Sequence, residues 1–138
     1  MAVLSDWVQI NGRMWDVLVM NIEESFNILY SENTGRTIEQ GAPMTLDPLG
    51  SFLGHKVTFA RNKDKRGEYD VLFDYLRQPR YQGLPIKIVH GQTTIEYDAY
   101  VSSGTRKLDK IDDEKHYVDW DEFEANFIPI RAQVIPSE

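Results

Sequence analysis

Apolar and polar side chains alternate in short runs along most of this chain. In the clearest run, Phe123, Ala125 and Phe127 alternate with Glu124 and Asn126. Successive side chains of a β-strand point to opposite faces, so each run predicts a strand with one face in a core. About seven or eight short strands are expected in all. They lie near residues 7–10, 13–19, 24–30, 56–60, 86–90, 93–102 and 122–129, with 131–135 as an extension or tail.

Turn-forming residues separate these runs. Asn11-Gly12 predicts a tight hairpin between the first two strands, because both residues tolerate the positive φ of a type I′ turn. Ser103-Gly104 predicts the end of the strand that begins at Thr93. A polar acidic loop over residues 109–119 is expected to follow.

Only one segment follows helical spacing. Its apolar residues recur at i, i+3, i+4 and i+7, and they are Tyr69, Leu72, Phe73 and Leu76. This stripe predicts one helix over about residues 68–77, which Pro79 ends. Such a short helix is marginal alone and must pack on a sheet. The whole pattern predicts a mainly β chain: an antiparallel β-sandwich or partly closed barrel with one flanking α-helix. Its 138 residues fit a single domain, 1–138.

Glycine and proline punctuate residues 40–54, which predicts a long irregular loop there. Loops of this length in a compact domain are usually functional or take part in assembly. We therefore expect an assembly loop marked by Gly41, Pro43, Pro48, Gly50 and Gly54.

Composition narrows the function classes. The formal net charge of −7 disfavours non-specific binding to nucleic acids and to anionic membranes. The chain has no cysteine, so disulfides, thiolate catalysis and cysteine-ligated metals are excluded. No signal-peptide pattern and no transmembrane-length apolar run is present, so synthesis in a cytosol without export by a signal peptide is expected.

No motif for catalysis or for a cofactor stands out. The three histidines, His55, His90 and His116, have no zinc-site spacing and are expected to be ordinary surface or strand-end residues. Nucleophile elbows and phosphate-binding glycine loops are also missing from the sequence. The many carboxylates leave a calcium site or a paired-carboxylate enzyme open, although charge runs usually form solvated faces. We expect no enzyme activity and no cofactor.

Charge is distributed unevenly along the chain. Residues 55–66 carry five basic residues against one acid, and residues 109–124 carry eight acids against two lysines. The two patches either pair within one chain, dock head-to-tail between copies to build a ring, or stay independently solvated. The candidate interface comprises Lys56, Arg61, Lys63, Lys65, Arg66, Asp112, Asp113 and Glu114.

Sheet edges and aromatic side chains raise the same question of assembly. A hairpin-rich sheet has edges that must be blunted or joined to another sheet. Tyr81, Tyr97 or Tyr100, and Trp120 are candidate interface anchors or a sugar-binding platform, with core packing as the commoner fate of each.

Several short motifs in order resemble small tail proteins encoded beside tail-tube and tape-measure genes in phages and prophages of Gram-positive bacteria. The resemblance covers most of the chain. The motifs are Ile10-Asn11-Gly12, Asn33-Thr34-Gly35-Arg36-Thr37, Leu76-Arg77-Gln78-Pro79, Tyr97-Asp98-Ala99-Tyr100-Val101-Ser102-Ser103-Gly104, Trp120 and Phe127-Ile128-Pro129-Ile130.

The resemblance implies a tail-tube-like or distal-tail-like structural protein of the virion tail, made in the host cytoplasm. Such proteins form rings, usually hexameric, at the tail-tube end or baseplate, and their inner sheets line the DNA channel. The implied partners are further copies of the chain and neighbouring tail-tube, tape-measure or baseplate-hub proteins. DNA would only pass through non-specifically, and no membrane is involved. Distal tail proteins usually carry a second, carbohydrate-binding-like domain, for which 138 residues leave no room.

Two alternatives come from other classes. The first is a carbohydrate-binding β-sandwich module, which would place Trp120 and nearby tyrosines on a concave surface. The second is a small enzyme that uses a carboxylate pair.

Overall fold

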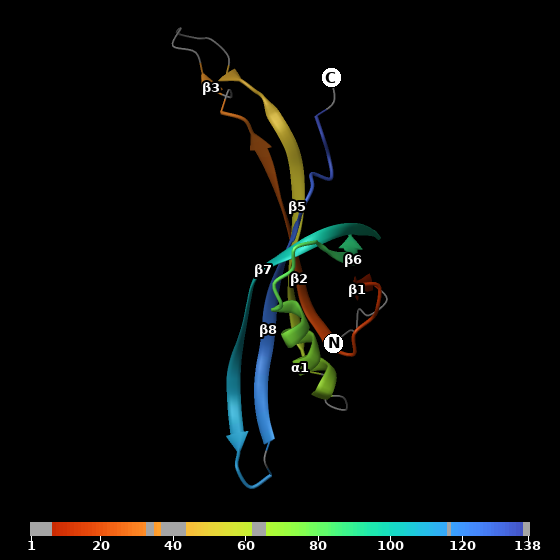
Figure 1. Ribbon diagram of the computed structural model, residues 1–138, viewed down its shortest axis with the longest axis vertical. Helices are drawn as coiled ribbons and strands as arrows, with labels where there is room; N and C mark the ends of the chain where they lie inside the picture. The colour runs from red at the N-terminus through yellow and green to blue at the C-terminus, as the bar shows by residue number, and fades with distance from the viewer. Residues whose placement is uncertain (1–6, 33–34, 37–43, 62–65, 116, 137–138) are drawn as a thin grey trace.

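A computed structural model describes residues 7–32, 35–36, 44–61, 66–115 and 117–136 (Figure 1). Within these residues the chain forms eight strands and one helix. Their bounds are β1 Val8–Ile10, β2 Leu18–Tyr30, β3 Gly35–Arg36, β4 Met44–Thr45, β5 Pro48–Ala60, α1 Arg66–Leu76, β6 Leu84–His90, β7 Thr93–Asp112 and β8 Tyr117–Pro129.

Six of the strands form one antiparallel sheet in the order β1-β6-β7-β8-β5-β2, and β3 pairs with β4 separately. The structure confirms the expected fold class, a mainly β, sandwich-like fold with one helix. The six-stranded sheet is not closed into a barrel, because β1 and β2 are its two edges.

Two long hairpins extend from the central body in opposite directions (Figure 1). One, the β2–β5 arm, comprises residues 25–32 and 44–54, where β2 pairs with β5. The other, the β7–β8 arm, comprises residues 104–115 and 117–122, where β7 pairs with β8. The helix lies beside the body and the inner part of the β7–β8 arm.

The hydrophobic core lies between α1 and the sheet. Phe123 is its aromatic centre, with ring centroids 5.0 Å from Phe59, 5.2 Å from Tyr69 and 5.3 Å from Phe73. Full burial of an apolar side chain contributes about 1.5–3 kcal/mol, so this cluster anchors the helix that the sequence could not stabilise alone. The alternation at Phe123, Ala125 and Phe127 is confirmed, since all three are buried.

The helix begins at Arg66 and ends at Leu76, within two residues of the expected span. Its end is fixed from outside by Arg80, whose guanidinium donates to the carbonyls of Tyr75 at 2.6 Å and Gln78 at 3.0 Å. The last carbonyls of a helix have no partner within the helix, so this side chain supplies one.

The expected hairpin at Asn11-Gly12 is only partly right. The turn forms, with φ of 56° and 75°, and the Ile10 amide donates to the Arg13 carbonyl at 3.0 Å. However, the pairing after the turn stops at the single Ile10–Arg13 bridge, and β1 pairs with β6 along its length. Trp15 explains the difference, because its buried indole donates to the Ile10 carbonyl at 3.0 Å and packs on the core, so the chain cannot continue as a ladder.

The predicted strand end at Ser103-Gly104 is wrong, and the acidic loop expected over 109–119 is shorter than predicted, since of its described residues only 113–115 form a turn. β7 continues through Gly104 to Asp112, and its ladder with β8 resumes after a register shift between Val101 and Gly104. A β-bulge absorbs extra residues without ending a strand, so the glycine that looked like a breaker lies inside one.

The predicted loop over residues 40–54 is wrong over the part that the structure describes. Gly41 and Pro43 lie outside the described residues. Pro48, Gly50 and Gly54 all belong to β5, with Pro48 as its first residue, where a missing amide is tolerated. Glycine is required at position 54 because β5 and β8 approach closely there: a Cβ on this residue would stand 3.0 Å from the Phe127 carbonyl oxygen.

Candidate functional site

Part of the basic patch pairs with acids of the same chain. Arg61 Nη1 lies 2.6 Å from Asp119 Oδ1, and Lys56 Nζ lies 3.3 Å from Glu124 Oε2. Lys63 and Lys65 lie outside the described residues, and of Arg66 only the backbone, at the start of α1, is described. Of the three alternatives for the charged patches, the structure therefore shows pairing within the chain for two of the basic residues.

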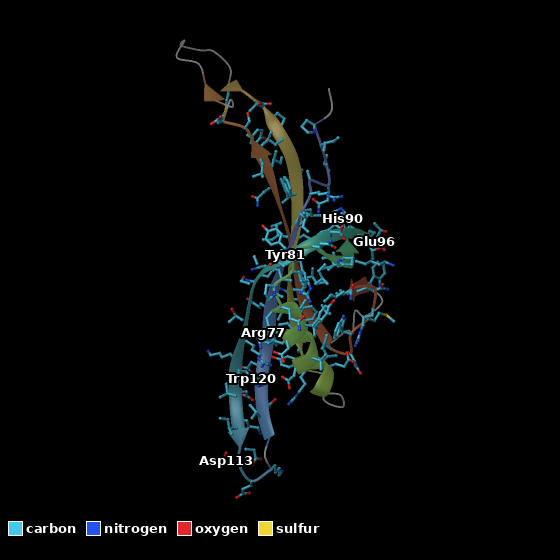
Figure 2. The ribbon with its side chains drawn as sticks, viewed as in Figure 1. Arg77, Tyr81, His90, Glu96, Asp113 and Trp120 are labelled. Carbon is cyan, nitrogen blue, oxygen red and sulfur yellow. The ribbon has the colours of Figure 1, made fainter. Side chains whose placement is uncertain are left out.

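The acidic half of the candidate interface lies elsewhere. Asp112 ends β7, and Asp113 and Glu114 follow in the turn of the β7–β8 arm; Figure 2 shows Asp113 at its far end. The Asp112 carboxylate accepts the Lys115 amide at 3.3 Å, which closes this turn. Asp113 and Glu114 are exposed. The structure thus separates these acids from Lys56 and Arg61, which pair with other residues.

Both arms expose large apolar side chains. Those on the β2–β5 arm are Phe26, Ile28, Leu29, Tyr30, Met44, Leu46 and Leu49. Those on the β7–β8 arm are Leu108, Ile111 and Val118. Phe26 is 65% exposed, whereas Phe123 in the body is 1% exposed. The same residue type is therefore exposed to solvent on the arm and buried in the body. The strand alternation over 24–30 was predictable, but its exposure was not.

The segment after β8 returns to the β2–β5 arm. Gln133 reaches Leu53 with both ends of its side-chain amide, accepting from the Leu53 amide and donating to the Leu53 carbonyl, each at 2.9 Å. The Ser51 amide donates to the Val134 carbonyl at 2.8 Å. These bonds occupy part of the β5 edge that β8 leaves open.

A histidine cluster lies where the β2–β5 arm joins the body. His55 is buried, which corrects the expectation of a surface residue. Its Nε2 lies 3.0 Å from Glu24 Oε2, and its Nδ1 lies 2.7 Å from the Tyr97 hydroxyl. His90 Nδ1 lies 2.6 Å from the same Glu24 oxygen. Figure 2 shows His90 at the end of β6. Residues from four strands therefore meet at one carboxylate and one buried imidazole.

The environment shifts the titration of this cluster. Burial lowers the pKa of His55, and hydrogen bonding and attraction from Glu24 offset only part of that effect. Burial alone would raise the pKa of Glu24, but the hydrogen bonds from His90 and His55 outweigh it and leave the pKa below its ordinary value. Burial also raises the pKa of Tyr97, so its hydroxyl keeps its proton. His116 lies outside the described residues.

Trp120 is partly buried against the core. The guanidinium carbon of Arg106 lies 4.1 Å from the Trp120 ring centroid and 4.1 Å from that of Phe73, while its Nη1 donates to Asp70 at 2.8 Å. A sugar platform needs an open ring face, and Arg106 covers one face of this ring. Of the other candidate anchors, Tyr81 is fully exposed, Tyr100 is half-exposed and Tyr97 belongs to the histidine cluster.

Among the described residues, no group of three or more histidine or acidic side chains is arranged to hold a metal ion. Nor does any helix in this part of the chain have the length and apolar character needed to cross a bilayer. The sequence matches no known protein-family profile, and the search of curated proteins finds no match either.

Proposed function

We propose that this protein is a structural subunit that forms a ring in a bacteriophage tail and acts through its surfaces. The observation that carries the proposal is the pair of arms with exposed apolar side chains. A two-stranded ribbon is at most marginally stable alone in water, and large exposed apolar patches mark contact surfaces. Both arms therefore suit surfaces that neighbouring subunits cover.

The type of assembly that we propose comes from the resemblance to small tail proteins. It favours a hexameric ring at the tail-tube end or baseplate, in contact with tail-tube, tape-measure or hub proteins. The acidic tip at Asp113 and Glu114 is available to a basic neighbour, because the bases Lys56 and Arg61 pair elsewhere. Charge complementarity of this kind orients docking more than it adds affinity.

The sheet face opposite α1 supports a channel-lining role. Polar side chains pair across it, with Lys56 beside Glu124 and Asn126 donating to the Ser103 hydroxyl at 3.0 Å. The net charge of −7 on the chain disfavours adhesion of DNA to this polar face, as a channel lining requires.

Light scattering coupled to size-exclusion chromatography, with electron microscopy at rising protein concentration, tests the proposal. The wild-type protein is expected to form rings, and Ile28→Lys is expected to abolish them by charging the face of the arm that Phe26, Ile28 and Tyr30 share. Asn27→Lys is the matched control, since it adds the same charge to the adjacent exposed residue on the other face. A protein that stays monomeric at every concentration and is absent from purified virions refutes the proposal.

A further inference from the structure

The histidine cluster connects strands that the sheet order keeps apart. Glu24 belongs to β2 at one edge, and His90 belongs to β6, which is next to the other edge strand. Three strands separate β2 from β6 in the hydrogen-bonded order, yet the Glu24 carboxylate and the His90 imidazole are 2.6 Å apart. The sheet therefore curls until its two sides meet at these side chains.

Hydrogen-bond chemistry fixes where the protons lie in this contact. An ionised carboxylate only accepts, so His55 Nε2 and His90 Nδ1 both carry the hydrogens that point at Glu24. In neutral His55, Nδ1 is then an acceptor, and the Tyr97 hydroxyl donates to it. Every polar atom of the His55 ring has a partner while the ring is neutral.

The strands packed around His55 each place an identified polar or apolar group next to its ring. β2 provides Glu24, β6 provides His90 and the main chain of Val89, and β7 provides Tyr97. On β8 the residue directly opposite His55 is the apolar Phe127. Glu24 thus faces both histidines, and protonation of His55 places an imidazolium ion in a buried position next to His90. The like charges and the loss of hydration oppose that state.

We propose that Glu24, His55, His90 and Tyr97 form a clasp that fastens the β2–β5 arm to β6 near neutral pH and releases it in acid. The clasp concerns one chain and does not depend on ring formation. Because His55 binds a proton less readily when buried, opening takes up protons, and each proton raises the open fraction by up to tenfold per pH unit.

The absence of cysteine allows a direct distance measurement. Spin labels at exposed Asn27 on β2 and Gln92 in the β6–β7 turn report the separation of the two sides. Labelled protein is diluted with unlabelled protein, so only distances within one chain are read, whether or not rings form. From about pH 7.5 to about pH 5, the wild-type distance distribution is expected to gain a longer component while circular dichroism stays that of a folded chain.

His55→Gln is the main test, because glutamine can donate to Glu24 and accept from Tyr97 without titrating in this range. It is expected to lose the acid response. Should this variant not fold, Glu24→Gln provides the second test and is expected to move opening to higher pH. Glu23→Gln is the matched control, since it removes the same charge from the neighbouring residue. Glu23 is opposite Lys56 in the sheet, whereas Glu24 is opposite His55. An unchanged wild-type distance, a wild-type response in His55→Gln, or equal shifts in Glu23→Gln and Glu24→Gln overturns the proposal.

Discussion

Arg106 and Trp120 stack, with the guanidinium carbon 4.1 Å from the indole ring centroid. The same guanidinium faces Phe73 on the helix, also at 4.1 Å. One side chain thus joins α1 to both strands at the root of the β7–β8 arm. The types and sequence spacing of these residues do not predict this contact, because it forms only when the helix packs against the arm.

Replacing Arg106 with alanine is expected to lower the free energy of unfolding by about 1–2 kcal/mol, because it removes the cation–π contacts with Trp120 and Phe73. Lys107→Ala, at the adjacent exposed residue, is expected to change it by less than about 0.5 kcal/mol. Urea unfolding followed by circular dichroism measures both. Equal effects of the two substitutions would show that the stacking contributes nothing.

Phenylalanine-to-alanine substitutions are expected to separate the body from the arm. Phe123→Ala removes the centre of the aromatic cluster and is expected to cost about 3–5 kcal/mol. Phe26→Ala, on an exposed side chain, is expected to leave monomer stability nearly unchanged and to weaken self-association instead. Chemical unfolding measures the first effect, and sedimentation at several concentrations measures the second. A large loss of monomer stability in Phe26→Ala would contradict the exposed position of this ring.

Gly54→Ala is expected to destabilise the protein by about 1–3 kcal/mol, because the added Cβ would stand 3.0 Å from the Phe127 carbonyl and would push β5 from β8. Gly35→Ala is the control, since a Cβ at Gly35 meets no atom within 4 Å. Thermal unfolding compares the two. If both variants melt at the same temperature, the close approach of the two strands is not what requires glycine.

Acid is expected to destabilise the protein from about pH 6.5 downward. The pKa of His55 is lower in the folded chain than its ordinary value of about 6.5, so the unfolded chain binds this proton more tightly. The contribution of neutral His55 is therefore complete above about pH 6.5 and is lost as the pH falls through the folded-state value. The lowered pKa of Glu24 has the same sign and adds a further loss below its ordinary value of 4.5.

Urea unfolding at a series of pH values measures this effect. His55→Gln is expected to flatten the upper part of the profile and to keep the loss due to Glu24 at lower pH. Parallel profiles for the wild type and this variant would assign the acid sensitivity to other groups.

Local patterns predicted the body of the fold well. The alternation at Phe123, Ala125 and Phe127 and the helical spacing around Leu72 both mark a buried face, and burial is what those patterns report. The arms were missed because Gly54 and Gly104 were interpreted as breaks. Their effect depends on neighbours that are distant in sequence, namely Phe127 and the shifted ladder of β8.

The histidine cluster had no local signal at all. His55 lies 31 residues from Glu24 and 42 from Tyr97, and its position between polar residues resembled a surface site. Only the curl of the sheet brings these residues together. The charged patches were visible in sequence, but which acid pairs with Arg61 depends on the register of β5 and β8, which sequence spacing does not determine.

The continuity of β5 gives the molecule a mechanical property. One strand runs from Pro48 on the β2–β5 arm to Ala60 in the body, a span of about 40 Å. A force on the outer end of the arm travels along this covalent backbone and loads the hydrogen bonds to β2 and β8 in shear, where they share the load. Tension on the arm is therefore transmitted to Val57 and Phe59, which are buried in the core. The arm and the core respond to such a force as one mechanical unit.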